Sequence, residues 1–286
     1  MSLNKSLVAD SFSKAAASYD EAAFLQNEVA ARVFERLSLM RIQPKQILDV
    51  GCGTGHCSRL LRDHFSKAKV FGIDIAPGMI EFAKQQQSLF RKINYQVADA
   101  DKLPFEDNSF ELVFSNLTIQ WLPDLAHTFK ELNRVLKPGG LLIFSTLGPD
   151  TLIELKQSWQ QVDAAVHVNE FIDMHIVGDL VFNSNFDNTV MDRDVITLTY
   201  KTMLGLMRDL KAIGAHNIDS DRPRGMLGKE KFSRLQAAYE NFRWPEGELP
   251  ATYEVIYGHA WKKIAKPAPD YHTYEVDIQT PESKTD

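Results

Sequence analysis

The ten residues 46–55, QILDVGCGTG, constrain this chain more than any other stretch. A short apolar run that carries one acid, Asp49, is followed by Gly51, Gly53 and Gly55 on alternate positions. Short apolar runs bounded by glycine are typical of buried parallel strands. Glycine also lets a ligand lie against bare backbone, and a helix that begins after the loop would point free N–H groups at it. The stretch therefore predicts the strand, ligand loop and helix of an α/β fold.

The spacing of these glycines and a second acid favour a cofactor without a pyrophosphate. The pattern is G-x-G-x-G, and the third glycine of a dinucleotide loop is missing, because His56 and Ser58 stand there instead. The run KVFGID then ends in Asp74, 19 positions after Gly55, followed by Ile75. An acid at about this spacing binds a ribose diol in nucleotide-type α/β folds. Together these motifs resemble the S-adenosylmethionine site of class I methyltransferases.

Charge and composition exclude several classes of protein. The chain has 286 residues and a formal net charge of −6, which argues against a general nucleic-acid binder. No apolar stretch approaches the length of a membrane span, and the first residues show no signal or transit pattern. We expect Cys52 and Cys57 to be free thiols in a reducing compartment, which favours the cytoplasm, and no metal partner set accompanies them.

Apolar periodicity predicts a doubly wound, mostly parallel α/β sheet of seven strands, closed by two late antiparallel strands. The expected strands are 47–50, 69–74, 93–98, 110–115, 141–146, 189–200 and 251–261. The expected helices are 6–39, 56–65, 77–90, 125–137, two within 149–186, 201–213 and 229–243. Residues 1–40 are expected to form a helical lid, 41–263 the methyltransferase domain with a helical cap inserted at about 150–185, and 264–286 a disordered tail.

Further ligand-binding candidates follow the third and fourth expected strands. Asp99 and Ala100 follow the third strand, where a carboxylate can accept an adenine amino hydrogen and a backbone N–H can donate to the ring. The alternative is a solvated acidic turn. Asn116 and Trp121 follow the fourth strand, beside the first, where ligands bind in such sheets. Trp121 could equally belong to the core.

The segment SFSKAAASYDEAA places two aromatic residues, Phe12 and Tyr19, seven positions apart. One interpretation is that both pack this segment onto the core. The other is a lid whose aromatic side chains close over cofactor and substrate.

Stretches across residues 6–263 resemble one family, the malonyl-acyl-carrier-protein O-methyltransferases of biotin synthesis. They are SFSKAAASYDEAAFLQ, QILDVGCGTG, DADKLPFEDNSFELVFSNLTIQW, LKPGG, FIDMHIVGDL, LKAIGAHN and LPATYEVIYGHAW. The central motifs are shared by many class I methyltransferases and identify only the cofactor, whereas the terminal ones discriminate. A related branch, the mitochondrial complex I assembly factor, shares the C-terminal motifs and is associated with arginine hydroxylation. A hydroxylase, an S-adenosylmethionine-binding assembly factor and a small-molecule methyltransferase therefore stay open as alternatives.

The resemblance implies methyl transfer to the free carboxylate of a malonyl thioester on an acyl carrier protein. Such a carboxylate is already ionised near neutral pH, so no general base is required. Tyr19 matches the family's lid tyrosine and could position the carboxylate, and Gln26 could reach the amino-acid end of the cofactor. A cation should bind the carboxylate, and Arg208 is the candidate, with His175 as a further polar residue. The alternatives are a surface charge for Arg208 and a structural role for His175.

An acyl carrier protein is acidic, so a basic face should receive it. The densest basic stretch contains Arg222, Arg224, Lys229, Lys231 and Arg234. We interpret it as a docking face, against the alternative of a solvated charged helix.

Overall fold

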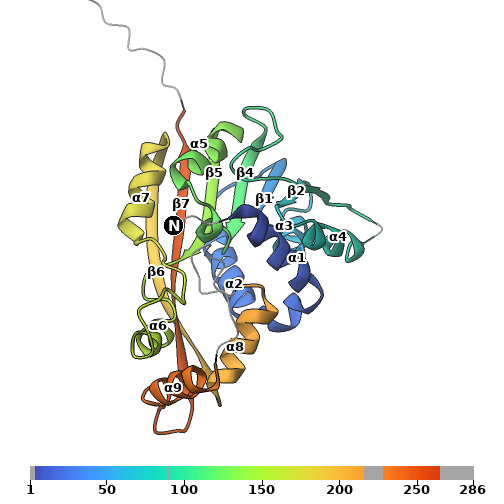
Figure 1. Cartoon of the computed structure of the whole chain (residues 1–286). Coiled ribbons are helices and arrows are strands. Elements are labelled where there is room, and N and C mark those ends of the chain that lie inside the picture. Colours follow the sequence, from blue (N-terminus) through green and yellow to red (C-terminus); the bar gives the residue numbers. More distant parts are fainter. Residues whose placement is uncertain (1–3, 89, 216–227, 265–286) are drawn as a thin grey trace, which may run out of the picture.

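The computed structural model describes residues 4–264, apart from residue 89 and residues 216–227. Within this part of the chain, seven strands form one sheet with the order β3-β2-β1-β4-β5-β7-β6 (Figure 1). The strands are β1 (Gln46–Val50), β2 (Lys69–Asp74), β3 (Asn94–Val97), β4 (Phe110–Asn116), β5 (Leu136–Leu147), β6 (Phe186–Tyr200) and β7 (Leu249–Lys262). The predicted fold class is confirmed.

The strand pairing places a ligand site beside β1. Strands β1 to β5 pair in parallel, while β7 pairs antiparallel with both β5 and β6. β1 pairs with β2 on one side and with β4 on the other, so the chain changes direction across the sheet here. Ligands of open α/β sheets bind at such a switch point, beyond the carboxyl ends of the strands. The glycine loop that follows β1 lies at this point.

Helices cover both faces of the sheet and form two separate cores. Their bounds are α1 (Lys5–Ala22), α2 (Phe24–Ser38), α3 (His56–His64), α4 (Pro77–Gln85), α5 (Leu125–Val135), α6 (Ile153–Gln160), α7 (Met174–Asn183), α8 (Met203–Ala212) and α9 (Lys229–Glu240), with a short 3-10 turn η1 (Ile119–Trp121). Residues of α2, α3 and α4 pack on one face, and residues of α5 and α7 on the other. β1 shows the alternation, because Ile47 joins the first core, whereas Leu48 and Val50 join the second.

The single helix expected over residues 6–39 is two helices. The backbone breaks at Ala23, where φ is −82° and ψ is 35°, outside the helical region. α2 continues along the sheet with Val29 and Val33 fully buried, while α1 leaves it and packs against α4 and α8 (Figure 1). The apolar spacing that predicts a helix does not report a change in its direction, so the sequence did not reveal this break.

The other boundary differences are small, with one exception. Residues 136–140 were expected to end a helix, but they begin β5, because Leu136 pairs with Phe110 before a register shift. Asp124 caps α5 by accepting from His127 N at 3.0 Å.

The two helices expected within the cap at 150–185 lie in different places. α6 contacts α9 and β7, whereas α7 covers the sheet with Val177 and Val181 fully buried. The division of the chain into lid, domain and cap stays a prediction. The expected tail, 264–286, lies outside the described residues, apart from residue 264.

Candidate active site

The glycine loop is held to the end of β2 by its backbone. The N–H groups of Gly51 and Cys52 both donate to the carbonyl of Ile73, at 2.8 and 2.9 Å. Gly51 has a φ of +70°, and a Cβ added to it would lie 2.1 Å from Thr118 Oγ1. Gly53 also has a positive φ, +52°, but nothing lies within 4 Å of its added Cβ. Gly51 is thus fixed by close packing, whereas Gly53 presents open backbone.

Asp74 joins β2 to this loop. Its Oδ2 accepts from Gly53 N at 3.0 Å, and its Oδ1 accepts from Ala76 N at 2.8 Å. Burial raises the pKa of this carboxyl, and the backbone N–H donors offset part of the rise. Each carboxylate oxygen has a further lone pair, so Asp74 can still bind two hydroxyl groups of a ligand.

A cavity of about 80 Å³ lies against the loop, and we call it the loop cavity. It is lined by several of the predicted cofactor residues and by the inner side of α1. The lining residues are Lys5, Val8, Phe12, Tyr19, Val50, Gly51, Gly53, Ile73, Asp74, Ile75, Met79, Ala98, Asp99, Ala100, Asn116, Leu117, Thr118, Trp121 and Leu122. The structure therefore brings these candidates together, although their contact with a cofactor stays a prediction.

Asp99 lies in a turn and is partly exposed, but its charge is paired with a cation from α1. Lys5, from the start of α1, places its Nζ 2.6 Å from Asp99 Oδ2 and 2.5 Å from Asp101 Oδ2. At the other end of α1, Asp20 accepts from the Thr54 hydroxyl at 2.6 Å. Both ends of the helix are thus bonded to the rim of the loop cavity.

Asp49 and Gly55 lie behind the loop and line neither cavity described here. Asp49 is only 1% exposed and accepts from Ser58 Oγ at 2.5 Å. Burial raises its pKa to about 7. A Cβ added to Gly55 would lie 2.2 Å from the hydroxyl of Tyr95. Both residues stabilise the shape of the loop. Their positions give no support to the prediction that Asp49 and Gly55 contact the cofactor directly.

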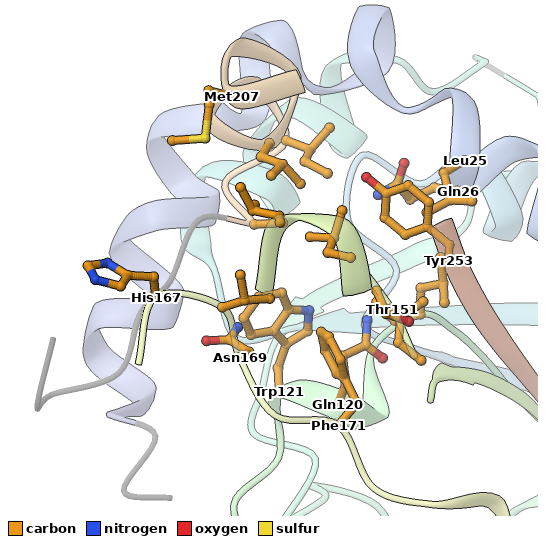
Figure 2. A pocket seen from close by; sticks show the side chains of 18 of the residues that line it. Leu25, Gln26, Gln120, Trp121, Thr151, His167, Asn169, Phe171, Met207 and Tyr253 are labelled. Atoms are coloured by element: carbon orange, nitrogen blue, oxygen red, sulfur yellow. Dashed lines mark hydrogen bonds between the residues drawn. The ribbon is translucent and has the colours of Figure 1, made fainter. Parts of the chain in front are cut away.

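A second, larger cavity of about 280 Å³ adjoins the first (Figure 2), and we call it the apolar cavity because no Asp, Glu, Lys or Arg occurs among its described lining residues. Residues from α1, α2, α6, α8 and the segment 167–171 surround it. It is lined by Phe12, Tyr19, Leu25, Gln26, Leu117, Gln120, Trp121, Leu147, Thr151, Leu152, Leu155, Trp159, His167, Val168, Asn169, Phe171, Met207, Leu210, Ile213, Ala215 and Tyr253. No lysine or arginine occurs among these described lining residues.

The two cavities share part of their walls. Phe12, Tyr19, Leu117 and Trp121 line both of them. The rings of Phe12 and Trp121 meet edge to face, with centroids 5.3 Å apart. Trp121 is thus both buried, at 9% exposure, and part of the site. A group passed from one cavity to the other would cross between these side chains.

Tyr19 lies at this shared boundary. It is half-buried, and burial together with the negative charge of Asp74 raises the pKa of its hydroxyl well above the ordinary value. The hydroxyl therefore stays protonated at neutral pH and can donate a hydrogen bond.

The structure does not bring Arg208 or His175 into the site. Arg208 is exposed on α8, although its neighbour Met207 lines the apolar cavity. The side chain of His175 is 85% exposed and its Nδ1 lies 2.9 Å from Asp173 Oδ1. Their proposed contact with substrate finds no support in this geometry, because both side chains are exposed at the surface.

Gln26 lines the apolar cavity and not the loop cavity. Its main-chain carbonyl accepts from Asn116 Nδ2 at 3.1 Å, and Asn116 Oδ1 accepts from Ser145 Oγ at 2.8 Å. Gln26 thus stands beside the loop cavity without forming its wall.

Sequence reasoning missed several lining residues. His167, Asn169 and Phe171 occur at alternate positions in an irregular segment. Lys5 is a lone charge at the start of a helix. None of them stands in a motif or shows a helical period, so only the tertiary structure reveals their place.

Within the described residues, no group of three or more His, Cys, Asp or Glu side chains is arranged to hold a metal ion. None of the helices in that part of the chain has the length and apolar character needed to cross a membrane.

Known structures share this fold. A methyltransferase domain family matches residues 48–144. A structure of a methyltransferase from Bacillus halodurans, described as putative, has a TM-score of 0.59 at 18% identity, covering 82% of this chain and 99% of the other. Phosphoethanolamine N-methyltransferase 2 of Haemonchus contortus, in complex with S-adenosyl-L-methionine, has a TM-score of 0.54 at 18% identity, covering 88% of this chain and 57% of the other. These likenesses show the fold.

Curated relatives share the sequence over nearly its whole length. Malonyl-[acyl-carrier protein] O-methyltransferase of Methylovorus sp. is 47% identical over 272 residues, covering 93% of this chain and 92% of the relative. The protein of that name from Legionella pneumophila is 41% identical over 255 residues, covering 89% and 90%. The chain therefore belongs to the malonyl-[acyl-carrier protein] O-methyltransferase family of S-adenosylmethionine-dependent methyltransferases.

Proposed function

We propose that this protein transfers the methyl group of S-adenosylmethionine to the free carboxylate of malonyl-acyl carrier protein. The observation that carries the proposal is the shared wall of the two cavities, with the Tyr19 hydroxyl at their boundary. One cavity has the glycine loop and the acid that fit a nucleoside, and the other has the apolar lining that fits an acyl group. The names of the relatives supply the acceptor.

The residues of the loop cavity fit the cofactor. Asp74 has free acceptor capacity for the two hydroxyls of a ribose, and Gly53 leaves its backbone open. Ile75, Asp99 and Ala100 line the part of the cavity where the adenine would bind. When bound, the cofactor supplies an electrophilic methyl group on a sulfonium.

The reaction needs alignment and no acid–base group. An O–CH₃ bond forms, an S–CH₃ bond breaks, and the electron pair of that bond stays on sulfur, so no proton moves. The chain's task is to align the carboxylate with the methyl group and to exclude water. The burial that raises the pKa of both Cys52 and Cys57 keeps them as thiols, so neither is suited to act as a nucleophile.

The methyl ester would mask a charge, so that fatty-acid synthesis enzymes accept the product as a primer for biotin. We place the protein in the cytoplasm, a proposal that the two free cysteines support. Cell fractionation with an antibody tests this placement, and recovery in an oxidising compartment contradicts it.

Incubation of the pure protein with S-adenosylmethionine and malonyl-acyl carrier protein tests the function. We expect the intact mass of the carrier to rise by one methyl group, with no gain on acetyl-carrier. No gain, with cofactor binding intact, overturns the proposal. Cofactor binding without any turnover would indicate an assembly factor, turnover of another acceptor a small-molecule methyltransferase, and dependence on oxygen and a reductant a hydroxylase.

The same assay tests Tyr19. Tyr19→Phe keeps the ring and removes only the hydroxyl, so the wall between the cavities stays intact. We expect kcat to fall by about 10-fold, the effect of losing one hydrogen bond to a charged group. The affinity for S-adenosylmethionine, measured by calorimetry, should stay unchanged. An unchanged kcat would show that the hydroxyl does not act on the substrate.

We propose that α9 helps to dock the carrier. Lys229, Lys231 and Arg234 are exposed on it, and α9 packs against α6, which lines the apolar cavity. Lys231 also lies 3.1 Å from Asp163 Oδ2, so part of its charge is neutralised. Arg222 and Arg224, the rest of the predicted face, lie outside the described residues.

Charge reversal tests this docking face. In Lys229→Glu/Arg234→Glu, we expect the KM for malonyl-acyl carrier protein to rise about 10-fold at low salt, because a basic face attracts an acidic partner. The KM for malonyl-pantetheine, which has no carrier, should not change. Lys67→Glu/Lys69→Glu at the amino ends of the strands is the matched control. Equal KM values in both double variants would exclude docking at α9.

A further inference from the structure

Three of the polar side chains that line the apolar cavity, those of Gln120, Thr151 and His167, are bonded within the protein. Gln120 Nε2 donates to the carbonyl of Leu117 at 2.8 Å, and Gln120 Oε1 accepts from Thr146 Oγ1 at 3.3 Å. The Thr151 hydroxyl donates to the carbonyl of Glu254 at 3.2 Å. These bonds help to hold the wall, although the Gln120 amide keeps a second N–H that they do not use.

Asn169 is different. Its side-chain oxygen is buried and has no hydrogen-bond partner, and the residue as a whole is only 9% exposed. Gln26 has an unpartnered oxygen too, but its main chain is bonded to Asn116, at the cofactor side. In Figure 2, Asn169 and Gln26 lie on opposite sides of the cavity. Asn169 lines the apolar cavity and not the loop cavity.

The segment that carries Asn169 is firmly held despite being irregular. His167 stacks on Trp159, with ring centroids 3.5 Å apart and planes 9° apart. Its Nε2 lies 2.7 Å from Asp163 Oδ1. Phe171, two residues beyond Asn169, also lines the cavity. The amide of Asn169 is thus presented to the cavity from a fixed backbone.

A buried amide oxygen without a partner lowers the stability of the free protein. In a native protein such a group calls for an explanation, and a ligand that completes its bonding is one. The terminal amide of asparagine can turn by 180°, which exchanges its oxygen and its NH₂ group, so it can offer a donor to a carboxylate or an acceptor to a hydroxyl. The side chain of Asn169 is therefore suited to bind a ligand.

A neutral donor suits the charge change in this reaction. The carboxylate and the sulfonium start with opposite charges, and both charges shrink as the methyl group moves. A cation on the carboxylate would stabilise the starting state more than the transition state, and so raise the barrier. The described lining of the apolar cavity has no lysine or arginine, in keeping with this requirement.

We propose that the side-chain amide of Asn169 binds the free carboxylate of the malonyl group as a neutral N–H donor, in place of a cation. The inference rests on the proposed function and names a residue that recognises its substrate. It replaces the cationic residue expected from the sequence.

Two substitutions of similar size test the proposal. Asn169→Leu removes the donor, and we expect the KM for malonyl-acyl carrier protein to rise about 10-fold or more. Asn169→Asp places a negative charge against the carboxylate, and kcat/KM should fall further than in Asn169→Leu. The affinity for S-adenosylmethionine should stay within about twofold of wild type in both, by calorimetry. Asn183→Leu, at the exposed end of α7, is the control and should change neither value.

Stability gives a second readout that does not depend on turnover. Because Asn169→Leu removes an unpartnered buried amide, its unfolding midpoint in urea should equal or exceed that of wild type. A lowered midpoint with an unchanged KM would make Asn169 structural and overturn the proposal, as would kcat/KM in Asn169→Asp at or above that of Asn169→Leu. Failure of the wild-type enzyme to methylate the carrier would overturn the proposed function instead.

Discussion

Replacing Asp74 by asparagine is expected to weaken S-adenosylmethionine binding by about 100-fold or more. The carboxylate accepts from Gly53 N and Ala76 N and has capacity for two ribose hydroxyls. A hydrogen bond to a charged group contributes about 1.5–3 kcal/mol, and the amide retains only one acceptor oxygen. Its NH₂ group would in addition face one of the two backbone N–H groups. The loss of one such bond, together with the weakening of the other, which no longer has a charged acceptor, corresponds to about two orders of magnitude.

Calorimetry on the purified variant measures this effect. Asp187→Asn, an exposed position on β6, makes the same chemical change far along the chain and should leave the affinity intact. Thermal unfolding without cofactor shows whether the Asp74→Asn variant still folds. A dissociation constant within about threefold of wild type in a folded variant would remove Asp74 from the cofactor site.

Two glycine substitutions in one loop are expected to fail in different ways. Gly51→Ala places a methyl group against Thr118 and holds a side chain at a φ of +70°. The left-handed backbone costs about 1–2 kcal/mol and the overpacking about 1–3 kcal/mol, so we expect a loss of about 2–5 kcal/mol in the free energy of unfolding. Gly53→Ala has the same kind of φ but open space around its methyl group, so its loss should stay near 1 kcal/mol.

Cofactor affinity completes this comparison. The added methyl group of Gly53→Ala would occupy the loop cavity, so we expect S-adenosylmethionine binding to fall at least about 10-fold in a protein that folds normally. Urea unfolding and calorimetry on both variants measure the two effects. If Gly53→Ala were the less stable variant, or bound the cofactor normally, the assignment of Gly51 to packing and Gly53 to binding would be wrong.

The grouping of residues around the loop cavity, the proposed cofactor half of the site, could be predicted because it obeys local rules. The glycine loop, the acid that ends β2 and the residues after β3 and β4 each follow a strand, and parallel strands bring their carboxyl ends together. Knowing where each strand ends was therefore enough to group Gly53, Asp74, Asp99 and Asn116. The pairing of β7 between β5 and β6 likewise agrees with two late strands that were expected to be antiparallel.

The acceptor half could not be predicted, for the opposite reason. Asn169 and His167 lie in a segment without secondary structure, and their place depends on a ring stacked on Trp159 from α6. The expectation of a cation led to Arg208, because charge is visible in a sequence whereas a buried amide without a partner is not. The turn at Ala23 could not be predicted from the sequence either. For this reason the ion pair between Lys5, at the start of α1, and Asp99 was not foreseen.

The order of the cavity walls along the chain separates two kinds of evolutionary change. Among the described residues, none beyond Leu122 lines the loop cavity, while the apolar cavity takes most of its wall from Leu147 onward. Mutations from Leu147 onward can thus change which acceptor binds, while the residues of the proposed cofactor site stay the same. Phe12 and Tyr19 of α1, together with Leu117 and Trp121, are the exception, because these four residues line both cavities. Drift at these positions is constrained from both directions, whichever acceptor a descendant of this protein adopts.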